Sequence, residues 1–250
     1  MLSVIVDDTR DPAWNLALDE ALARVAAVPA PTGPAGAARA RPFPVLRVWQ
    51  NAPSVLVGRF QCLADAVDLA CCAHDGVRVA RRATGGGAVY TDSGTLLFTL
   101  VHRAARQPGT RPDLGALVAA AVAGLGLPAA ALGDGIVQSA RLRTRHAELT
   151  HVAVHVTDLG PYDRSYLAGP PGGRRTLAGL GLQVSLDAVR AAVLGMMIER
   201  YGIAATRRPD PRERSLQEHL HARRYGDLTW HLTGTHGPRH PARPRLYSAH

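Results

Sequence analysis

The most restrictive feature of this sequence is the stretch RRATGGGAVYTDSG at residues 81–94, where two arginines run into three consecutive glycines. Glycine loses more backbone freedom on folding than any other residue, so Gly85–Gly87 are unfavourable to order. The apolar pattern predicts a strand just before this stretch, at 77–80, and another just after it, at 95–102. The chain must therefore turn between two strands through a backbone that some other group approaches closely.

This layout differs from the dinucleotide-binding motif, in which the pattern G-x-G-x-x-G opens a helix. Here Tyr90–Gly94 leads into a strand, so no helix dipole is directed at a ligand. Bare N–H groups at a sheet edge instead form a concavity suited to a carboxylate or a phosphate. Each guanidinium group of Arg81 and Arg82 can donate two parallel hydrogen bonds to such a group. A tight glycine turn flanked by solvated arginines is the structural alternative.

Hydrophobic periodicity predicts an α+β fold, with helices packed against short strands of which several are antiparallel. The clearest helices are 14–25, preceded by Asp11-Pro12, and 186–202, which ends at a glycine. Further helices are expected at 63–74, 112–124 and 212–224, and strands at 2–6, 45–49, 54–58, 77–80, 95–102 and 151–156.

Two segments fall outside this pattern. Residues 28–42 are rich in proline, alanine and glycine and predict a flexible loop. Residues 235–250 are basic, rich in proline and without apolar periodicity, so we expect a disordered tail. The remaining chain, 1–234, is expected to form one domain.

The chain contains no lysine, so all 29 of its basic residues are arginine, and its net charge is +9. Phosphate-binding loops that need a lysine and Schiff-base chemistry are therefore excluded. The charge fits either a compositional bias toward arginine or an acidic partner. The chain has 5% aromatic residues, no long apolar run, no secretory signal pattern, and three cysteines that are too few and too oddly placed for a disulfide framework. We therefore expect a cytoplasmic protein without a nucleic-acid or membrane partner.

The stretch RRATGGGAVYTDSGTLLFTL closely resembles the signature of the biotin/lipoate protein ligase superfamily, in its lipoate-protein ligase A and octanoyltransferase branch. Three other stretches resemble segments of that branch in the same order: DDTRDPAWNLALDEAL, LRVWQNAPSVLVGRFQ and RYGDLTWHLTG. The resemblance covers most of residues 4–234. It implies the biotin/lipoate ligase fold, similar to class II synthetases, with a mixed, largely antiparallel sheet and flanking helices.

The resemblance implies a pocket for a lipoyl or octanoyl group whose carboxyl end lies at the glycines. Ligases of the family use ATP and magnesium to form an acyl-adenylate and pass the acyl group to a lysine of a lipoyl domain or H protein. Transferase relatives take octanoate from acyl carrier protein through a cysteine thioester. The implied substrate-binding residues are Arg81, Arg82, Gly85, Gly86, Gly87, Ala88, Val89, Tyr90 and Asp92.

The sequence departs from the family where the family carries a lysine that holds the substrate carboxyl and the developing charge. The corresponding region, SARLRTRHAELTHVAVHVTDL, offers Arg141 or Arg143 as the catalytic cation instead. A guanidinium is a wide, planar fork and not the equivalent of an ammonium point charge. Thr91 also stands where the family has histidine, before Asp92, which we expect either to orient the loop and help hold magnesium or to cap a turn.

Other candidate residues are weaker. Cys62 follows the Gly-Arg-Phe-Gln turn, and a small core residue is the alternative to a thiol nucleophile. His151 and His155 share one face of a predicted strand but lack a third metal ligand, so no metal site is assigned. Three functions remain open: acyl transfer onto a protein lysine, the same chemistry on another acceptor, or a binding module that has lost catalysis.

Overall fold

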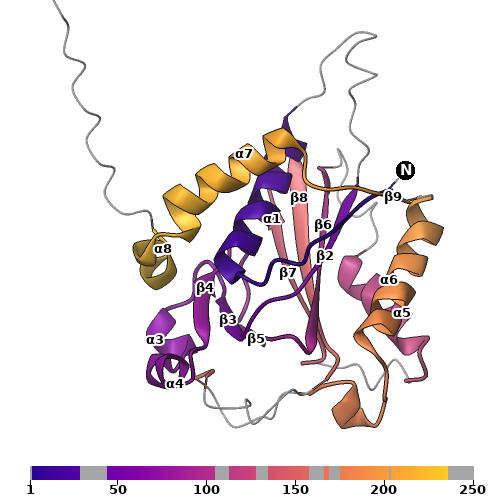
Figure 1. Cartoon of the computed structure of the whole chain (residues 1–250), viewed down its shortest axis with the longest axis horizontal. Helices are drawn as coiled ribbons and strands as arrows, with labels where there is room; N and C mark the ends of the chain where they lie inside the picture. The colour runs from indigo at the N-terminus through magenta and orange to yellow at the C-terminus, as the bar shows by residue number, and fades with distance from the viewer. Residues whose placement is uncertain are drawn as a thin grey trace, which may run out of the picture.

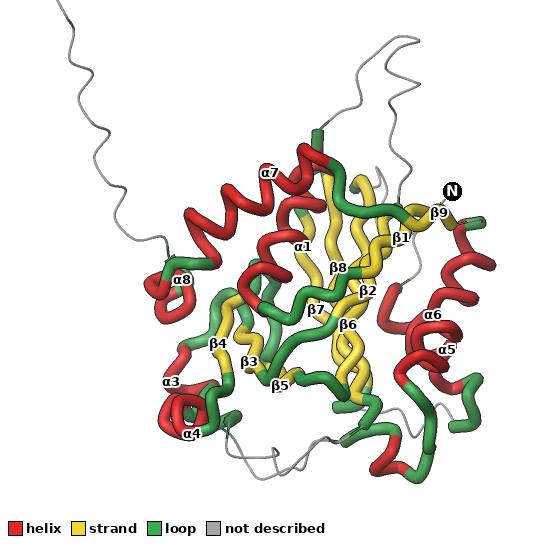
Figure 2. The backbone as a smooth tube through the Cα atoms, viewed as in Figure 1, coloured by secondary structure: helices red, strands yellow, loops and turns green. Residues whose placement is uncertain are grey.

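The computed structural model of the protein describes residues 2–28, 44–104, 113–127, 135–157, 166–168, 175–202 and 204–235. A six-stranded sheet runs through the molecule with helices on both of its faces, and a smaller sheet lies beside it (Figures 1 and 2). This arrangement confirms the predicted α+β class. The expected loop at 28–42 and tail at 235–250 lie, apart from Val28 and Thr235, outside the described residues.

The large sheet has the strand order β7-β8-β6-β2-β1-β9. Neighbours from β7 to β2 are antiparallel, whereas β2, β1 and β9 are parallel to one another, so the sheet is mixed. Its strands are β1 (Leu2–Val6), β2 (Val45–Trp49), β6 (Thr95–Arg103), β7 (Val137–Arg143), β8 (Ala147–His155) and β9 (Ala204–Thr206).

The small sheet consists of β4 (Arg78–Arg81), β3 (Ser54–Val57) and β5 (Val89–Thr91), in that order. Strand β3 pairs parallel with β4 and antiparallel with β5. The chain therefore passes from the large sheet into the small one at 50–53, between β2 and β3. It returns to the large sheet after the glycine stretch, through β5 and β6.

Helix α1 (Pro12–Ala27) covers one face of the large sheet, with α7 (Pro211–Leu220) packed against it, and α5 (Leu114–Ala123) and α6 (Leu186–Tyr201) cover the other face (Figure 1). Local sequence explains their ends. The Asp11 side chain accepts a hydrogen bond from the Trp14 N–H at the start of α1. A glycine with a φ of 83°, Gly202, follows α6. These starts and ends confirm the sequence prediction.

The predicted helix at 63–74 is wrong in one respect, because it is divided into α3 (Leu63–Ala66) and α4 (Leu69–His74). Val67 has extended backbone and forms an isolated bridge with Leu167. Asp68 then starts the second helix by accepting a hydrogen bond from the Cys71 N–H.

The predicted helix at 212–224 also divides, since α7 is followed by a π-helical segment, η3 (His221–Tyr225), and then by α8 (Leu228–Thr233). The buried Glu20 carboxylate accepts hydrogen bonds from Arg224 Nη1, at 2.6 Å, and from the Tyr225 hydroxyl, at 2.7 Å. These contacts fix η3 against α1. A single turn of 3₁₀-helix, η2 (Ala178–Leu180), precedes α6. Within the described residues, no helix is long and apolar enough to cross a bilayer.

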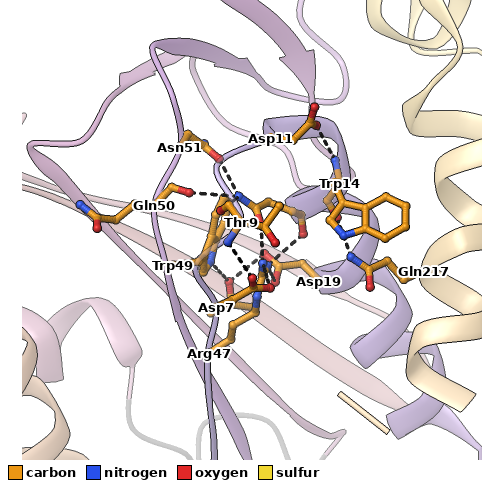
Figure 3. A network of polar contacts seen from close by, with 12 residues as sticks. Asp7, Thr9, Asp11, Trp14, Asp19, Arg47, Trp49, Gln50, Asn51 and Gln217 are labelled. Atoms are coloured by element: carbon orange, nitrogen blue, oxygen red, sulfur yellow. Dashed lines mark hydrogen bonds and ion pairs between the residues drawn. The ribbon is translucent and has the colours of Figure 1, made fainter. Parts of the chain in front are cut away.

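A buried arginine joins α1 to the large sheet. Arg47, which is 0% exposed on β2, donates from Nη1 to Asp19 Oδ1 at 2.7 Å and from Nη2 to Asp7 Oδ2 at 2.8 Å (Figure 3). Its Nη1 also donates to the Asn15 carbonyl oxygen. Burial alone would raise the pKa of Asp19, but the attraction of Arg47 and the contact with His151 outweigh it, and the pKa is lowered.

We expect Arg47→Met to lower the free energy of unfolding by about 3–5 kcal/mol, because it leaves the Asp19 carboxylate buried without its main counter-charge. Urea denaturation gives this value. The control is Arg190→Ala, which removes an ion pair with the exposed Asp187 and should change stability by less than about 1 kcal/mol. Equal effects of the two substitutions would contradict a central role for Arg47.

Candidate functional site

A cavity of about 90 Å³ lies between the small sheet and strands β6, β7 and β8 of the large sheet. Its walls are mainly apolar, and its polar groups come from the glycine stretch, from β7 and from β8. The lining residues are Leu56, Arg82, Gly87, Val89, Leu97, Gln138, Ser139, Ala140, His151 and Ala153.

Arg82 holds the glycine stretch in shape. Its Nη1 donates to the Leu56 carbonyl oxygen at 2.7 Å, and its Nη2 donates to those of Gly85 and Gly87, at 2.9 and 2.7 Å. The side chain is 4% exposed. Burial lowers its pKa to about 10, so the group stays charged at neutral pH. Arg82 thus places a positive charge at the cavity wall while it turns two carbonyl groups of the loop inward.

The structure explains why two positions, Gly58 and Gly86, must be glycine, which the sequence alone did not show. A Cβ at Gly58 would lie 1.9 Å from the Gly86 carbonyl oxygen, so the two backbones approach more closely than a side chain allows. Gly86 has a φ of 95°, in the left-handed region that favours glycine. In contrast, a Cβ at Gly85 or Gly87 would meet no atom within 4 Å. Open space therefore borders these two glycines, next to the cavity.

Arg81 points away from the cavity, because adjacent residues of a strand project to opposite faces. It is 1% exposed, and its guanidinium donates to five backbone carbonyl oxygens. Three belong to the turn after β3 and two to α8. This geometry ties the C-terminal helix to the small sheet and leaves no donor directed at a substrate carboxylate.

The residues after the glycines are divided between the two faces of β5. Val89 lines the cavity, whereas Tyr90 lies in a separate apolar cluster and stacks on Tyr166 with ring centroids 5.3 Å apart. Ala88 is half-buried at the edge of that cluster. Asp92 is 3% exposed and accepts hydrogen bonds from the Gly94 N–H and the Thr95 hydroxyl, which is the geometry of a capped turn.

The two arginines expected to replace the family lysine lie on β7, and both are exposed. Arg141 pairs with Asp113 at 3.0 Å and with Glu148 at 3.2 Å. On the same strand, the Ala140 Cβ faces the glycine stretch, 3.9 Å from the place of a Cβ on Gly86. Strand alternation therefore directs Arg141 and Arg143 to the other face of β7. The structure does not bring them together with the cavity.

His151 brings a titratable group into the cavity. Its Nε2 lies 2.9 Å from Asp19 Oδ2, the carboxylate that Arg47 anchors. The sequence singled out His151 only as a weak metal candidate and did not predict Asp19. The available signal was Arg47 itself: an arginine inside the apolar strand VLRVW indicates a buried counter-charge on a packed neighbour.

The other candidate residues do not converge on the cavity. Cys62 is exposed and does not line it, and burial raises the pKa of the Cys72 thiol to about 11. His155 lies four residues from His151 on the same face of β8, and its Nδ1 is 3.2 Å from the Thr95 hydroxyl. Among the residues the structure describes, no group of three histidine, cysteine or carboxylate side chains is placed to hold a metal ion.

The fold and this site define a class of protein: a mixed α+β domain with an apolar cavity beside an arginine-supported glycine loop. The family model for the lipoyl protein ligase A/B catalytic domain matches residues 11–146, which include β2 to β7, and the chain belongs to this family. A curated relative, lipoate-protein ligase A subunit 1 of Thermoplasma acidophilum, is 47% identical over 59 residues. That match spans 24% of this chain and 22% of the relative.

Solved structures extend the similarity to most of the chain. One contains a bi-partite lipoate protein ligase and its E2 lipoyl domain, from an archaeal lipoylation system of T. acidophilum. It has a TM-score of 0.75 and 25% identity, covering 95% of this chain and 98% of that one. A lipoate-protein ligase A bound with ATP also has a TM-score of 0.75 and 25% identity, with 93% and 99% coverage. These similarities confirm the predicted lipoate ligase branch and fold.

We expect Gly58→Ala to lower the free energy of unfolding by about 1–3 kcal/mol, because the added methyl group meets backbone that cannot move without disturbing the loop. Thermal or urea unfolding measures the change. Gly85→Ala is the matched control, since its methyl group enters open space and should change stability by less than about 0.5 kcal/mol. A similar loss in both variants would argue against close packing of the two turns.

The environment of His231 on α8 leads to a prediction about the pH dependence of stability. Its Nδ1 accepts a hydrogen bond from the Arg81 N–H at 3.0 Å, so it must be unprotonated, and its Nε2 lies 2.7 Å from the Tyr225 carbonyl oxygen. Burial lowers the pKa of His231 below its ordinary value of 6.5, against the opposing effect of the Tyr225 contact. The stabilising contribution is therefore complete above the unfolded value and is lost as pH falls through the folded value.

The measurement is urea denaturation at a series of pH values below neutrality. His231→Gln, which does not titrate, should remove part of the acid-induced loss of stability, and His219→Gln on the exposed side of α7 should not. An unchanged pH profile in His231→Gln would show that other groups cause the loss.

Proposed function

We propose that this protein binds a medium-chain acyl group, lipoyl or octanoyl, and transfers it to a lysine of a lipoyl-domain acceptor. The observation that carries the proposal is the cavity between the Arg82-supported glycine loop and strands β6 to β8. Apolar side chains of Leu56, Val89 and Leu97 form its walls, as an acyl chain requires. The positive charge and the open side of the glycine loop suit the carboxyl end.

The glycine stretch also suits the phosphate of an acyl-adenylate. Gly87 is exposed and Gly85 half-buried, and neither has atoms close to the place of a Cβ. Their N–H groups make no hydrogen bond to another described residue. ATP would supply the adenylate that activates the acyl carboxyl group, as the ATP complex of a similar ligase suggests. Within this site Arg82 and the loop N–H groups would orient the carboxyl and phosphate oxygens.

For the acceptor we propose a lipoyl domain, because a similar protein was solved with its E2 lipoyl domain. The net charge of +9 would favour encounter with an acidic acceptor in the cytoplasm. An H protein as acceptor, acyl carrier protein as octanoyl donor, and magnesium bound with ATP are finer variants of the same proposal. Arg81 and Tyr90 would support the glycine loop indirectly, through the contacts that hold the small sheet together, and would not touch the substrate.

One observation favours a second function, that of a binding module without acyl activation. The chain has no lysine, and Arg141 and Arg143 project from the face of β7 opposite Ala140. Arg82 is the cationic side chain that the structure places at the cavity, and its described hydrogen bonds go to backbone carbonyl groups. Such a module would bind the acyl group and pass nothing on.

The deciding measurements are calorimetric binding of lipoate and octanoate, and exchange of radioactive pyrophosphate into ATP with either acid. We expect acyl binding, and ATP-dependent exchange if the protein is a ligase. Arg82→Gln should weaken binding at least about tenfold, the effect of losing one charge-assisted contact. Binding of neither acid would refute the acyl proposal. Binding without exchange, and without ATP-independent transfer of octanoate from acyl carrier protein, would favour the module.

Arg141→Gln and Arg143→Gln are the matched controls, because each removes one arginine charge from the opposite face of the sheet. Unchanged exchange in both variants would support Arg82 as the relevant cation. Loss of exchange in either one, with binding intact, would instead support the sequence-based assignment of the catalytic cation to β7.

A further inference from the structure

The imidazole of His151 is a titratable group in the cavity wall to which acyl binding alone assigns no task. It lies on β8 between Ala140 on β7 and Thr99 on β6, its partners in the strand register. It is 8% exposed, and its ring packs edge-on against Trp49, with centroids 6.2 Å apart. A histidine buried in an apolar wall affects which ligands that wall accepts, because its nitrogen atoms need partners.

The orientation of His151 is set by a rigid carboxylate. Asp19 accepts hydrogen bonds from Arg47 Nη1 at 2.7 Å and from the Thr99 hydroxyl at 2.8 Å. The same hydroxyl accepts from Trp49 Nε1 at 2.9 Å, so its proton is directed at Asp19. The carboxylate therefore cannot rotate away, and its Oδ2 lies 2.9 Å from His151 Nε2.

This contact determines what the ring presents on its other edge. Nε2 lies at ion-pair distance from Asp19 without a well-aligned hydrogen bond, and because a carboxylate only accepts, Nε2 is the nitrogen that bears a proton. In the neutral form of the ring, Nδ1 then keeps a lone pair. No described residue donates a hydrogen bond to Nδ1. A ring that lines the cavity and directs Nε2 at Asp19 turns this acceptor away from the protein network.

We infer that His151 makes the cavity selective for acyl chains that carry a hydroxyl or thiol donor, such as a reduced dithiol, over plain hydrocarbon chains. The inference rests on the proposed acyl-binding function and adds the chemical class of the tail. A plain chain that covers Nδ1 removes water from it and offers no replacement, which weakens binding by about tenfold. A chain with an O–H or S–H group replaces the water.

The experiment is calorimetric binding of four kinds of probe to the full chain: octanoate, hydroxyoctanoates with the hydroxyl at successive carbons, their methoxy counterparts, and dihydrolipoate under reducing conditions. We expect the best hydroxyoctanoate and dihydrolipoate to bind about tenfold more tightly than octanoate. The methoxy compound has an acceptor but no donor, so it should gain nothing over octanoate.

Three variants separate recognition from a structural role. His151→Leu keeps a similar side-chain volume but has no acceptor, so the dissociation constants of all probes should lie within about twofold of one another. His151→Asn keeps an oxygen near the position of Nδ1 and should restore part of the preference. His219→Leu, the same change on an exposed position of α7, should leave the preference unchanged. Thermal unfolding checks that each variant is folded.

The outcomes distinguish the inference from the proposed function. Equal binding of octanoate and every hydroxyoctanoate by the unmodified protein, or a preference that persists in His151→Leu, overturns the inference and leaves acyl binding in place. Tighter binding of the methoxy compound overturns it as well, because Nδ1 would then act as a donor. Binding of none of the probes overturns the acyl function itself. If His151→Leu does not fold, the probe series and His151→Asn still decide.

Discussion

The guanidinium of Arg47 is the constraint on which the rest of the structure depends. It cannot lose its proton in a protein, so at 0% exposure it must be surrounded by acceptors. Asp7, at the end of β1, and Asp19, on α1, supply the charges, and the Asn15 side chain and carbonyl supply neutral oxygens. Because these groups come from separate segments, satisfying the arginine fixes α1 over the sheet. The same carboxylate then orients His151 at the cavity, so the stability of the fold and the chemistry of the site share one network.

The two adjacent arginines of the glycine stretch have different tasks because a strand sends successive side chains to opposite faces. Arg81 binds carbonyl groups of the turn after β3 and of α8, and so joins the small sheet to α8. Arg82 binds Gly85 and Gly87 and faces the cavity. Because their side chains are identical, the sequence offered both equally as substrate-binding residues. The difference follows from the register of β4 beside β3, which residue types alone do not specify.

Elements with strong local signals could be predicted from the sequence. Helix α1 has an apolar face and an Asp-Pro start, and α6 has periodicity and a final glycine, so both were predicted within a few residues. Short strands such as β5, with three residues, and β9 were not predicted, because pairing with distant segments stabilises them. Strand β7 was missed for a related reason: its exposed arginines hide the alternation that its partner β8 shows clearly.

The candidate site also has a part that local sequence predicted and a part that depends on contacts between distant residues. The glycine motif and its resemblance identified the loop, Arg82 and Val89, since these lie close together in sequence. Asp19 was not predicted, because in the sequence it lies on a helix beside Glu20 and looks like part of a solvated face. It is buried only because Arg47 on one side, and the packing of α7 and η3 on the other, enclose α1. Such burial depends on contacts between residues far apart in the chain.

The balance of charge at the cavity bears on catalysis. Acyl activation develops negative charge, and a donor aimed at that charge stabilises it far more than one engaged elsewhere. The Nη1 and Nη2 groups of Arg82 donate to Leu56, Gly85 and Gly87, whereas its buried Nε has no described partner, so the guanidinium cannot present its full fork of hydrogen bonds to a ligand. Under the proposed function, most direct contacts with the reacting oxygens would then come from the N–H groups of the loop. A chain without lysine can therefore bind an anionic acyl group through backbone and field together, and its rate of activation depends on how closely those N–H groups approach the developing charge.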